Sequence, residues 1–329
     1  MQILIILLAL LLGCFGAFVI QKYGYWFGII DVPNERSSHN QIVTKGGGIG
    51  ILAAFVFCAF FLGLSGTFWV PALFLSIVSL FGDRVELSAK LRLIVQFICS
   101  LVFLAGLLPS YHAHYAVYFL SLPFAVYIVG TSNFYNFMDG VNGIAGITGV
   151  VGFMLIAAYG AVSGAESIYI TLCIAVAFSC AGFLPFNIPN AKVFMGDVGS
   201  ILLGFVFACM VVIFSKCLLD FICLAGLLFP FYADELITMV VRIKNGDSLG
   251  NAHRKHIYQL LANEYGIEHW KISVGYGFLQ LLIGVLLIIL KNSGYIPVLS
   301  LLLCCFVGFS LFSAIIRMKL KKYHEVGEG

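Results

Sequence analysis

Long apolar runs alternate with short polar segments along the chain. A bilayer core about 30 Å thick needs about 20 apolar residues per helix, within a range of about 17–25. The pattern therefore predicts eleven transmembrane helices, at approximately 2–20, 47–66, 68–82, 91–109, 115–131, 143–162, 167–184, 198–215, 217–234, 272–290 and 295–316. The run at 68–82 is short and is expected to be tilted or partly interfacial. The first run lacks a basic segment before it and a clear cleavage site, which indicates a retained helix rather than a signal peptide.

The composition agrees with a protein that lies in the bilayer. Of the 329 residues, 61% are apolar and 10% are charged, whereas soluble domains contain about 45–50% apolar and about 25% charged residues. These values exclude a soluble enzyme and a nucleic-acid-binding protein. A formal net charge of +3 gives no indication of a polyanionic partner. The predicted fold class is an all-α, polytopic integral membrane protein whose surroundings are the lipid bilayer.

Charged residues are sorted between the two sides that eleven spans would create. Of the 18 Lys and Arg residues, only Lys216 and Lys291 fall on the side opposite to the others. Positive residues are retained in the cytoplasm, so the N-terminus is predicted outside and the C-terminus inside. All carboxylates except Glu166 and Asp220 fall on the same cytoplasmic side. This asymmetry favours an enzyme of the cytoplasmic surface over a transporter, which more often carries ionisable groups near the bilayer midplane.

The first two polar connections carry cations, a glycine run and a carboxylate. Arg36 and His39 are followed by Lys45 and by Gly46–Gly48 at the start of the second predicted helix. Backbone N–H groups at a helix start can cradle phosphate oxygens, so Arg36, His39 and Lys45 are candidate substrate-binding residues. The alternative is a positively charged anchor with a close helix–helix contact. Asp83 stands at a membrane boundary, where a carboxylate needs a role or a partner; the alternative there is a salt-bridged turn.

The third connection is N-F-Y-N-F-M-D-G-V-N-G-I-A-G, from Asn133 to Gly146. If this segment is helical, Asn136, Asp139 and Asn142 fall near one face. Mg²⁺ in proteins takes one or two carboxylates together with waters and substrate phosphates, so this face suits a magnesium ion. The alternative is packing of small residues between helices, which accounts for the glycines but not for Asp139.

The fourth connection, from Phe186 to Ser200, places Asp197 immediately before the eighth predicted span. A carboxylate there either caps the helix or holds a metal ion together with Asp139. Phe194 lies three residues earlier and either stacks on a base or anchors the segment at the membrane surface.

The fifth connection contains P-F-Y-A-D-E and then N-A-H-R-K-H-I-Y-Q, from Asn251 to Gln259. His253 and His256 are one helical face apart and flank Arg254 and Lys255, which indicates an anion site. No third ligand follows at a spacing typical of zinc. Carboxylates that suit Mg²⁺, several cations and a membrane surface together indicate phosphoryl transfer involving a lipid.

Read together, these five segments resemble the polyprenyl-phosphate N-acetylhexosamine-1-phosphate transferase superfamily. The resemblance runs in order from Asp31 to Gln259, and its most specific parts are N-F-M-D-G-V-N-G-I-A-G and V-F-M-G-D-V-G-S. It implies one membrane-embedded catalytic domain over residues 1–329. It also implies transfer of a HexNAc-1-phosphate from a UDP-N-acetylhexosamine to undecaprenyl phosphate, with release of UMP and with Mg²⁺ as cofactor, for which Mn²⁺ is the alternative.

By position, the resemblance implies roles for individual residues. Asp197 would be the principal metal ligand, with Asn136 and Asp139 at the other metal and nucleotide positions. Asn187 would contact the diphosphate and Phe194 would stack on uracil. The residues expected to meet phosphates or the sugar are Lys45, His253, Arg254 and His256. The expected catalytic residues are Asp83, Asp139, Asp197, His253 and His256.

The chain departs from the family pattern at three places. Asn142 stands where some branches carry a second Asp. The family's acidic pair is Gly82–Asp83 here, so the first carboxylate, which would abstract a proton, is missing. H-R-K-H-I-Y-Q replaces the three-histidine run of the phospho-N-acetylmuramoyl-pentapeptide transferases. This favours the branch that initiates O-antigen or another cell-surface polysaccharide, with UDP-GlcNAc or a deoxy-aminosugar such as UDP-FucNAc or UDP-QuiNAc as donor.

Several alternatives stay open from the sequence. They are the muramoyl-pentapeptide transferase of peptidoglycan synthesis, a transporter for a lipid-linked sugar, and a non-catalytic membrane scaffold. The expected location is the bacterial cytoplasmic membrane with the active site in the cytoplasm, and a homodimer is possible.

Overall fold

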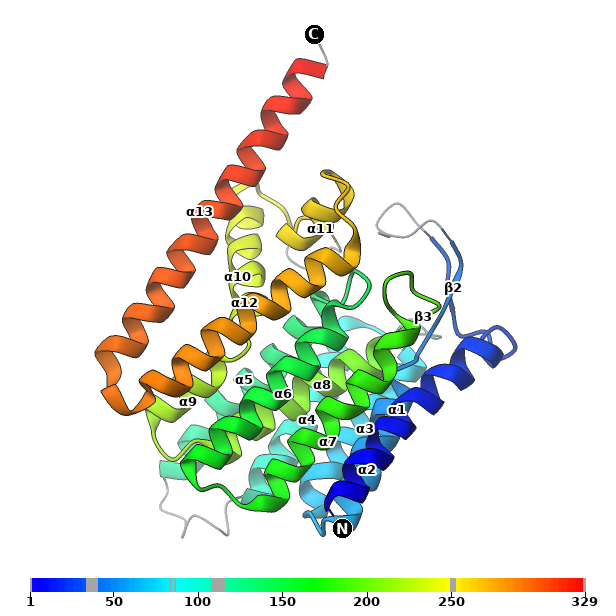
Figure 1. The fold of residues 1–329 in the computed structure, drawn as a ribbon, viewed down its shortest axis with the longest axis vertical. Helices are drawn as coiled ribbons and strands as arrows, with labels where there is room; N and C mark the ends of the chain where they lie inside the picture. Colours follow the sequence, from blue (N-terminus) through cyan, green and yellow to red (C-terminus); the bar gives the residue numbers. More distant parts are fainter. Residues whose placement is uncertain are drawn as a thin grey trace.

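The computed structural model describes residues 2–33, 41–82, 85, 87–107, 116–248 and 253–327. These residues are nearly all helical (Figure 1). The helices are α1 (Gln2–Tyr23), α2 (Ile49–Phe61), α3 (Gly66–Gly82), α4 (Ala89–Leu107), α5 (Ala116–Phe137), α6 (Ile144–Ser163), α7 (Ser167–Phe183), α8 (Asp197–Phe214), α9 (Leu218–Gly226), α10 (Phe229–Lys244), α11 (Ile257–Asn263), α12 (His269–Leu290) and α13 (Tyr295–Gly327).

Most of the predicted apolar runs coincide with one helix each. Within the described residues, seven helices are long and apolar enough to cross a membrane. The number rises to eight if α9 and α10 together form one broken span, and α2 and α3 are shorter apolar helices. The protein is therefore a multi-pass membrane protein. The count of eleven spans and the orientation of the termini stay predictions.

The ninth run, predicted as one span over 217–234, is not a single straight helix. The chain forms α9 and α10 instead, and the axes of these two helices differ by 83°. Pro230 stands in the first turn of α10, where its missing N–H leaves no bond unmade. Hydropathy cannot reveal this bend, because the residues on both sides of the break are apolar. The bend turns the first half of α10, which carries Asp234 and Glu235, toward the interior.

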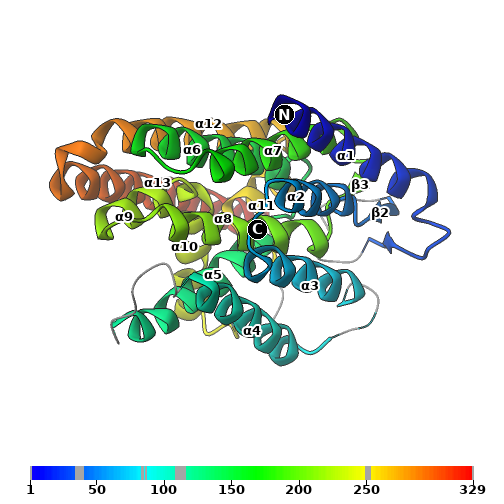
Figure 2. The same cartoon turned by 90° about the horizontal axis from the view of Figure 1, so that it is seen from below.

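Helix α8 forms the centre of the bundle (Figure 2). In the apolar stretch of α8, 89% of the residues are buried, whereas in that of α13 only 11% are buried. A helix that is apolar on every side is stable only when neighbours surround it or lipid does. Consequently α8 provides a fixed platform for its first residue, Asp197, whereas α13 lies at the periphery and leans away from the bundle (Figure 1).

Two glycines let the backbones of α1 and α7 approach closely. A Cβ atom added at Gly13 would lie 2.1 Å from the carbonyl oxygen of Ser179, and one at Gly182 would lie 2.2 Å from that of Leu10. Small residues at helix interfaces permit this kind of packing in membranes. Close helix contact is thus the role of glycine at these two positions.

We expect Gly182→Val to destabilise the protein by about 3 kcal/mol, because overpacking against backbone cannot be relieved by side-chain movement. The matched control is Gly130→Val in α5, where an added Cβ meets nothing within 4 Å. Thermal unfolding of the detergent-solubilised variants, followed by size-exclusion chromatography, gives the comparison. Equal unfolding temperatures for the two variants would contradict the close contact of α1 and α7.

Three of the four exceptions to the charge sorting, Lys216, Asp220 and Lys291, lie together at one end of the bundle. Tyr159 donates a hydrogen bond to Asp220 Oδ1 at 2.5 Å, and the backbone N–H of Lys216 donates to Asp220 Oδ2 at 3.1 Å. The ammonium of Lys291 lies 4.2 Å from the ring centroid of Tyr159. These residues serve as partners for one another, and they join the ends of α6, α9 and α12.

A small sheet lies at the opposite end, on the same side of the molecule as α11 (Figure 1). Its strands are β1 (Ile30–Asp31), β2 (Val43–Lys45) and β3 (Val193–Phe194). β2 pairs antiparallel with β1 and parallel with β3, and Lys45 stands opposite Phe194 in the register. The sheet is the only departure from an all-α fold among the described residues. It joins two connections that are about 150 residues apart in the sequence.

Candidate active site

Asp197 occupies the first position of α8, directly after Gly196, whose φ of 74° requires glycine. Its Oδ1 accepts a hydrogen bond from Asn136 Nδ2 at 3.0 Å, and its Oδ2 lies 3.3 Å from Arg92 NH1. The carboxylate is partly open, with 26% of the side chain exposed. A helix N-terminus is a favourable place for a carboxylate, and this one stands on a fixed platform where a ligand can reach it.

Arg92 was missed by the sequence reasoning as a site residue. It lies in the first turn of α4, and its NH2 atom also approaches the carbonyl oxygen of Gly82 at 3.4 Å. Gly82 immediately precedes Asp83, which lies outside the described residues. In the sequence, Arg92 is recognisable only as a lone arginine at the boundary of a predicted span. The fold shows that it faces Asp197.

A pair of amides fixes the relative positions of Arg92 and Asn136. Asn133 Nδ2 donates to Gln96 Oε1 at 2.6 Å, and Gln96 Nε2 approaches Asn133 Oδ1 at 3.3 Å. Gln96 is one turn after Arg92 in α4, and Asn133 is one turn before Asn136 in α5. The reciprocal pair therefore sets the register of α4 against α5 directly beneath the site.

The expectation that Asn136, Asp139 and Asn142 share one helical face is wrong, because α5 ends at Phe137. Asn136 remains in the last turn and reaches Asp197, while Asp139 and Asn142 lie in the loop before α6. Asn142 Nδ2 donates to the carbonyl oxygen of Pro189 at 3.1 Å, so this side chain connects two loops.

Asp139 lies beside α11. Burial, together with the charges of Asp234 and Asp139, raises the pKa of Tyr258 well above its usual value. The Tyr258 hydroxyl therefore stays protonated, and it donates to the carbonyl oxygen of Phe137 at 3.0 Å. This bond ties α11 to the C-terminal end of α5, directly before the loop that contains Asp139.

Asn187 is buried and connects two loops. Its Oδ1 accepts from the Gly143 N–H at 2.6 Å, and its Nδ2 donates to the carbonyl oxygen of Val193 at 2.9 Å. Both ends of the amide are thus used within the protein. A direct contact of Asn187 with a diphosphate stays a prediction.

Gly47 and Gly48 do not form the expected phosphate cradle, because other parts of the chain take their N–H groups. The Gly47 N–H donates to the carbonyl oxygen of Phe194 and the Gly48 N–H to that of Met195, each at 2.9 Å. A Cβ at Gly48 would lie 2.4 Å from the Cα of Gly199. The alternative of close packing is correct for these two glycines, and their N–H groups hold the β3 segment in place. The same contacts bring Lys45 beside Phe194, and both side chains are half-buried.

The histidine segment divides into a buried and a more open part. His256 is 2% exposed; its Nδ1 lies 3.7 Å from Asp234 Oδ1 and its Nε2 lies 3.4 Å from Glu235 Oε2. His253 and Arg254 are half-buried. Burial, with the nearby positive groups, lowers the pKa of His253 to about 4, so at neutral pH His253 is a hydrogen-bonding group rather than a cation.

The structure thus brings Asn136, Asp197 and Arg92 into contact and places Asp139 nearby, on the loop that follows Asn136. Arg36, His39 and Asp83 lie outside the described residues. Within the described ranges, no three His, Cys, Asp or Glu side chains form a cluster that could hold a metal ion by themselves. Mg²⁺ needs fewer protein ligands than that, because it retains waters and takes phosphate oxygens. Asp197 and Asp139, with the amide oxygen of Asn136, supply hard oxygen ligands of the type that Mg²⁺ prefers.

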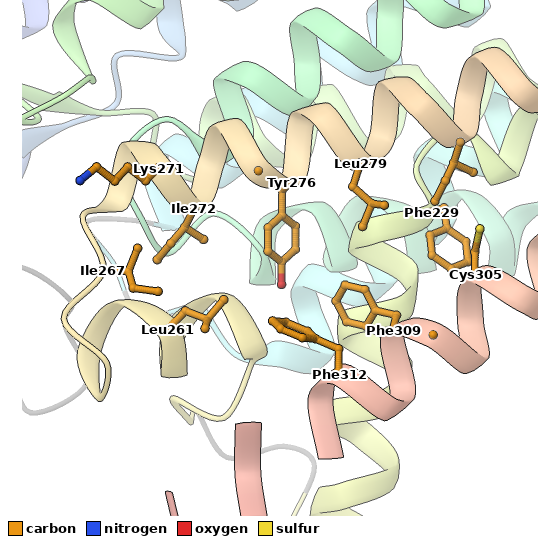
Figure 3. Close-up of a pocket in the computed structure, with 13 residues that line it drawn as sticks. Phe229, Leu261, Ile267, Lys271, Ile272, Tyr276, Leu279, Cys305, Phe309 and Phe312 are labelled. Carbon is orange, nitrogen blue, oxygen red and sulfur yellow. The ribbon is translucent and has the colours of Figure 1, made fainter. Parts of the chain in front are cut away.

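An apolar pocket of about 570 Å³ lies elsewhere, between α12 and α13 (Figure 3). Its walls include Phe229, Tyr276, Leu279, Phe309 and Phe312, with Lys271 at one end. None of the residues predicted for the active site lines it. Apolar walls do not compensate the desolvation of a diphosphate, so this pocket is not the nucleotide-sugar site.

Comparison with known proteins gives a family match over this part of the chain. A family model described as "Glycosyl transferase family 4" matches residues 65–215, a range that includes Arg92, Asn136, Asp139 and Asp197. A "Probable undecaprenyl-phosphate N-acetylglucosaminyl 1-phosphate transferase" of Bacillus subtilis (strain 168) is 25% identical over 272 residues, which are 76% of this chain and 74% of the relative.

Two further relatives extend the comparison. An "Undecaprenyl-phosphate alpha-N-acetylglucosaminyl 1-phosphate transferase" of Thermotoga maritima is 26% identical over 287 residues, 85% of this chain and 88% of the relative. A "Phospho-N-acetylmuramoyl-pentapeptide-transferase" of Staphylococcus aureus (strain JH9) is 32% identical over 206 residues, 59% of this chain and 61% of the relative. Residues 65–215 thus match glycosyl transferase family 4, and most of the chain is similar to undecaprenyl-phosphate N-acetylglucosaminyl 1-phosphate transferases.

Proposed function

We propose that this protein transfers GlcNAc-1-phosphate from UDP-GlcNAc to undecaprenyl phosphate and releases UMP. The observation that carries the proposal is the cluster at the start of α8, where the partly open carboxylate of Asp197 meets Asn136 and Arg92. The names of the two relatives that match most of their length specify undecaprenyl phosphate and N-acetylglucosaminyl 1-phosphate transfer. They favour GlcNAc over FucNAc or QuiNAc as the sugar.

The proposed reaction is a displacement at phosphorus. An oxygen of the lipid phosphate forms a bond to the β-phosphorus of the nucleotide sugar, and the bond from that phosphorus to the oxygen bridging to the α-phosphate breaks. UMP leaves with that oxygen. A Mg²⁺ ion held by Asp197, Asp139 and Asn136 would neutralise charge on the diphosphate and the leaving group.

The side chains of this chain have binding and orienting roles in the proposal. Phe194 stacks on uracil, and Lys45 lies next to it in the sheet register, where its ammonium can meet a phosphate. Arg254 and His253 contact phosphates or the sugar from the segment before α11. Because most of the catalysis in phosphoryl transfer is positioning and charge neutralisation, these roles require fixed loops more than a strong base.

Gly82 does not prevent this chemistry. A phosphate monoester has a second pKa of about 6, so the lipid phosphate is largely ionised at neutral pH and attacks without prior deprotonation. If a base takes part, Asp83 is the candidate that the chain retains from the family's acidic pair.

The setting of the proposed reaction follows from the charge sorting. The predicted eleven spans with the N-terminus outside would put the Asp197 end of the bundle in the cytoplasm, where nucleotide sugars are available. The product would be the first lipid-linked intermediate of a cell-surface polysaccharide such as O-antigen, in the cytoplasmic membrane of a bacterium. Both a monomer and a homodimer are compatible with this assignment.

The test is UMP release by the purified protein with undecaprenyl phosphate, Mg²⁺ and a panel of donors. The panel contains UDP-GlcNAc, UDP-FucNAc, UDP-QuiNAc and UDP-MurNAc-pentapeptide. We expect release that requires the lipid and is fastest with UDP-GlcNAc. A preference for UDP-MurNAc-pentapeptide would identify a peptidoglycan enzyme instead. Folded protein that releases no UMP with any donor would support the scaffold alternative.

A further inference from the structure

Asp234 is a fully buried carboxylate with an unusual number of donors. It lies in the first half of α10 and is 0% exposed. Its Oδ1 accepts from the Ile257 N–H at 2.8 Å and from the Thr238 hydroxyl at 3.2 Å. Its Oδ2 accepts from the Tyr276 hydroxyl at 2.7 Å and from the Tyr258 N–H at 3.3 Å. Such a carboxylate is fully satisfied by the protein, so its role is toward the protein rather than toward a ligand.

Two of these donors are the first backbone N–H groups of α11. A helix start leaves such groups without intrahelical partners, and a negative charge there is favourable. α11 has only seven residues, and a helix that short does not form by its own propensity. The position of α11 therefore depends on contacts with other parts of the chain. Two of these contacts are the hydrogen bonds to Asp234, which lies in α10.

The same carboxylate also faces His256, the residue immediately before α11. The two ring nitrogens of His256 approach Asp234 and Glu235, at 3.7 Å and 3.4 Å. The His256 ring in turn lies 4.8 Å from the His253 ring, between centroids. Asp234 thus lies against His256, whose ring packs next to that of His253 in the segment that also carries Arg254.

The far side of α11 contacts the loop that contains Asp139. The Tyr258 hydroxyl reaches the carbonyl oxygen of Phe137 at 3.0 Å, and a Cβ at Gly140 would lie 2.3 Å from that hydroxyl. Tyr276 projects from α12 beside the apolar pocket (Figure 3), and its hydroxyl donates the hydrogen bond to Asp234 Oδ2. A continuous set of contacts runs from α12 through Asp234 and α11 to the Asp139 loop.

We propose that Asp234 is a positioning residue for the reaction. It docks α11 and His256, and so sets the His253–Arg254 segment and the Asp139 loop at the distance that the reacting phosphates require. This inference rests on the proposed function. A displacement of about 1 Å at a reacting centre costs about 100-fold in rate, so a residue that touches no substrate can control turnover.

The test compares Asp234→Asn with Glu235→Gln. Asparagine has one acceptor oxygen, so it cannot accept the Ile257 and Tyr258 N–H groups with both terminal atoms as the carboxylate does. Glu235→Gln changes the neighbouring carboxylate, which also faces His256 but makes no bond to the α11 backbone among the described contacts. We measure kcat and KM for UMP release, and hydrogen exchange of peptides from α6, α8 and residues 257–263, in detergent.

For Asp234→Asn we expect kcat to fall about 100-fold, KM for UDP-GlcNAc to change less than about threefold, and exchange to accelerate in 257–263 only. For Glu235→Gln we expect wild-type exchange and a fall in kcat of less than about tenfold. Activity of Asp234→Asn within twofold of wild type would overturn the proposal. Lost activity with unchanged exchange in 257–263, or faster exchange throughout α6 and α8, would overturn it as well. If wild-type protein releases no UMP, the proposed function fails, while the exchange comparison still decides whether Asp234 holds α11.

Discussion

Asp197→Asn is expected to lower the rate of UMP release about 1,000-fold, the upper end of what one electrostatic group contributes in a preorganised site. The amide keeps the size of the side chain and can still accept the hydrogen bond from Asn136. It removes the negative charge that a metal ligand at the start of α8 must supply. The measurement compares the initial rates of UMP release by variant and wild type at saturating UDP-GlcNAc and lipid. We expect Asp139→Asn to lower this rate as well.

Protein stability is expected to change little in Asp197→Asn. The ion pair with Arg92 has side-chain exposures of 42% for Arg92 and 26% for Asp197, and partly exposed pairs contribute about 1 kcal/mol or less. Glu268→Gln is the matched control, because it also converts an ion-paired carboxylate, 3.1 Å from Lys271, into an amide. We expect the control to keep full activity. Wild-type turnover in Asp197→Asn would remove Asp197 from the metal site.

Removal of divalent metal with EDTA is expected to abolish UMP release, and added Mg²⁺ is expected to restore it, with Mn²⁺ as a partial substitute. The described residues offer Asp197, Asp139 and an amide oxygen, which suit a hard cation that also binds phosphate oxygens. Without the ion, the charge that develops on the leaving UMP has no comparable partner.

The protein should remain folded after metal removal, because Arg92 and Asn136 already satisfy Asp197 without a metal ion. Size-exclusion profiles with and without EDTA provide this control. Full activity in EDTA, with metal content verified by elemental analysis, would contradict a metal-dependent mechanism. Loss of the folded peak in EDTA would instead indicate a metal ion that supports the structure.

The helical elements could be read largely from the sequence. Apolar runs long enough for a bilayer leave no alternative to helices, because backbone groups in lipid must bond within their own segment. The bend between α9 and α10 could not be read in this way, since it lies inside a continuous apolar run. It depends on how α10 packs against α5, α12 and α13, and it brings Asp234 to α11.

The candidate site was predictable in part. The motifs identified Asn136, Asp139 and Asp197 as a group, and the structure places the first and last of these in direct contact. The helical arrangement assumed for Asn136, Asp139 and Asn142 was wrong because α5 ends at Phe137. The expected phosphate cradle at Gly47 and Gly48 was wrong because a strand from another connection takes their N–H groups.

The sequence by itself determined that this chain is a multi-pass helical membrane protein with its reactive groups in a few polar connections. Hydropathy and residue type are local properties, and they suffice for that conclusion. Only the tertiary structure decided which connections meet. Arg92 reaches Asp197 across 105 residues, and Asp234 reaches the start of α11 from 23 residues earlier. Such contacts depend on the packing of whole helices, so no short stretch of sequence specifies them.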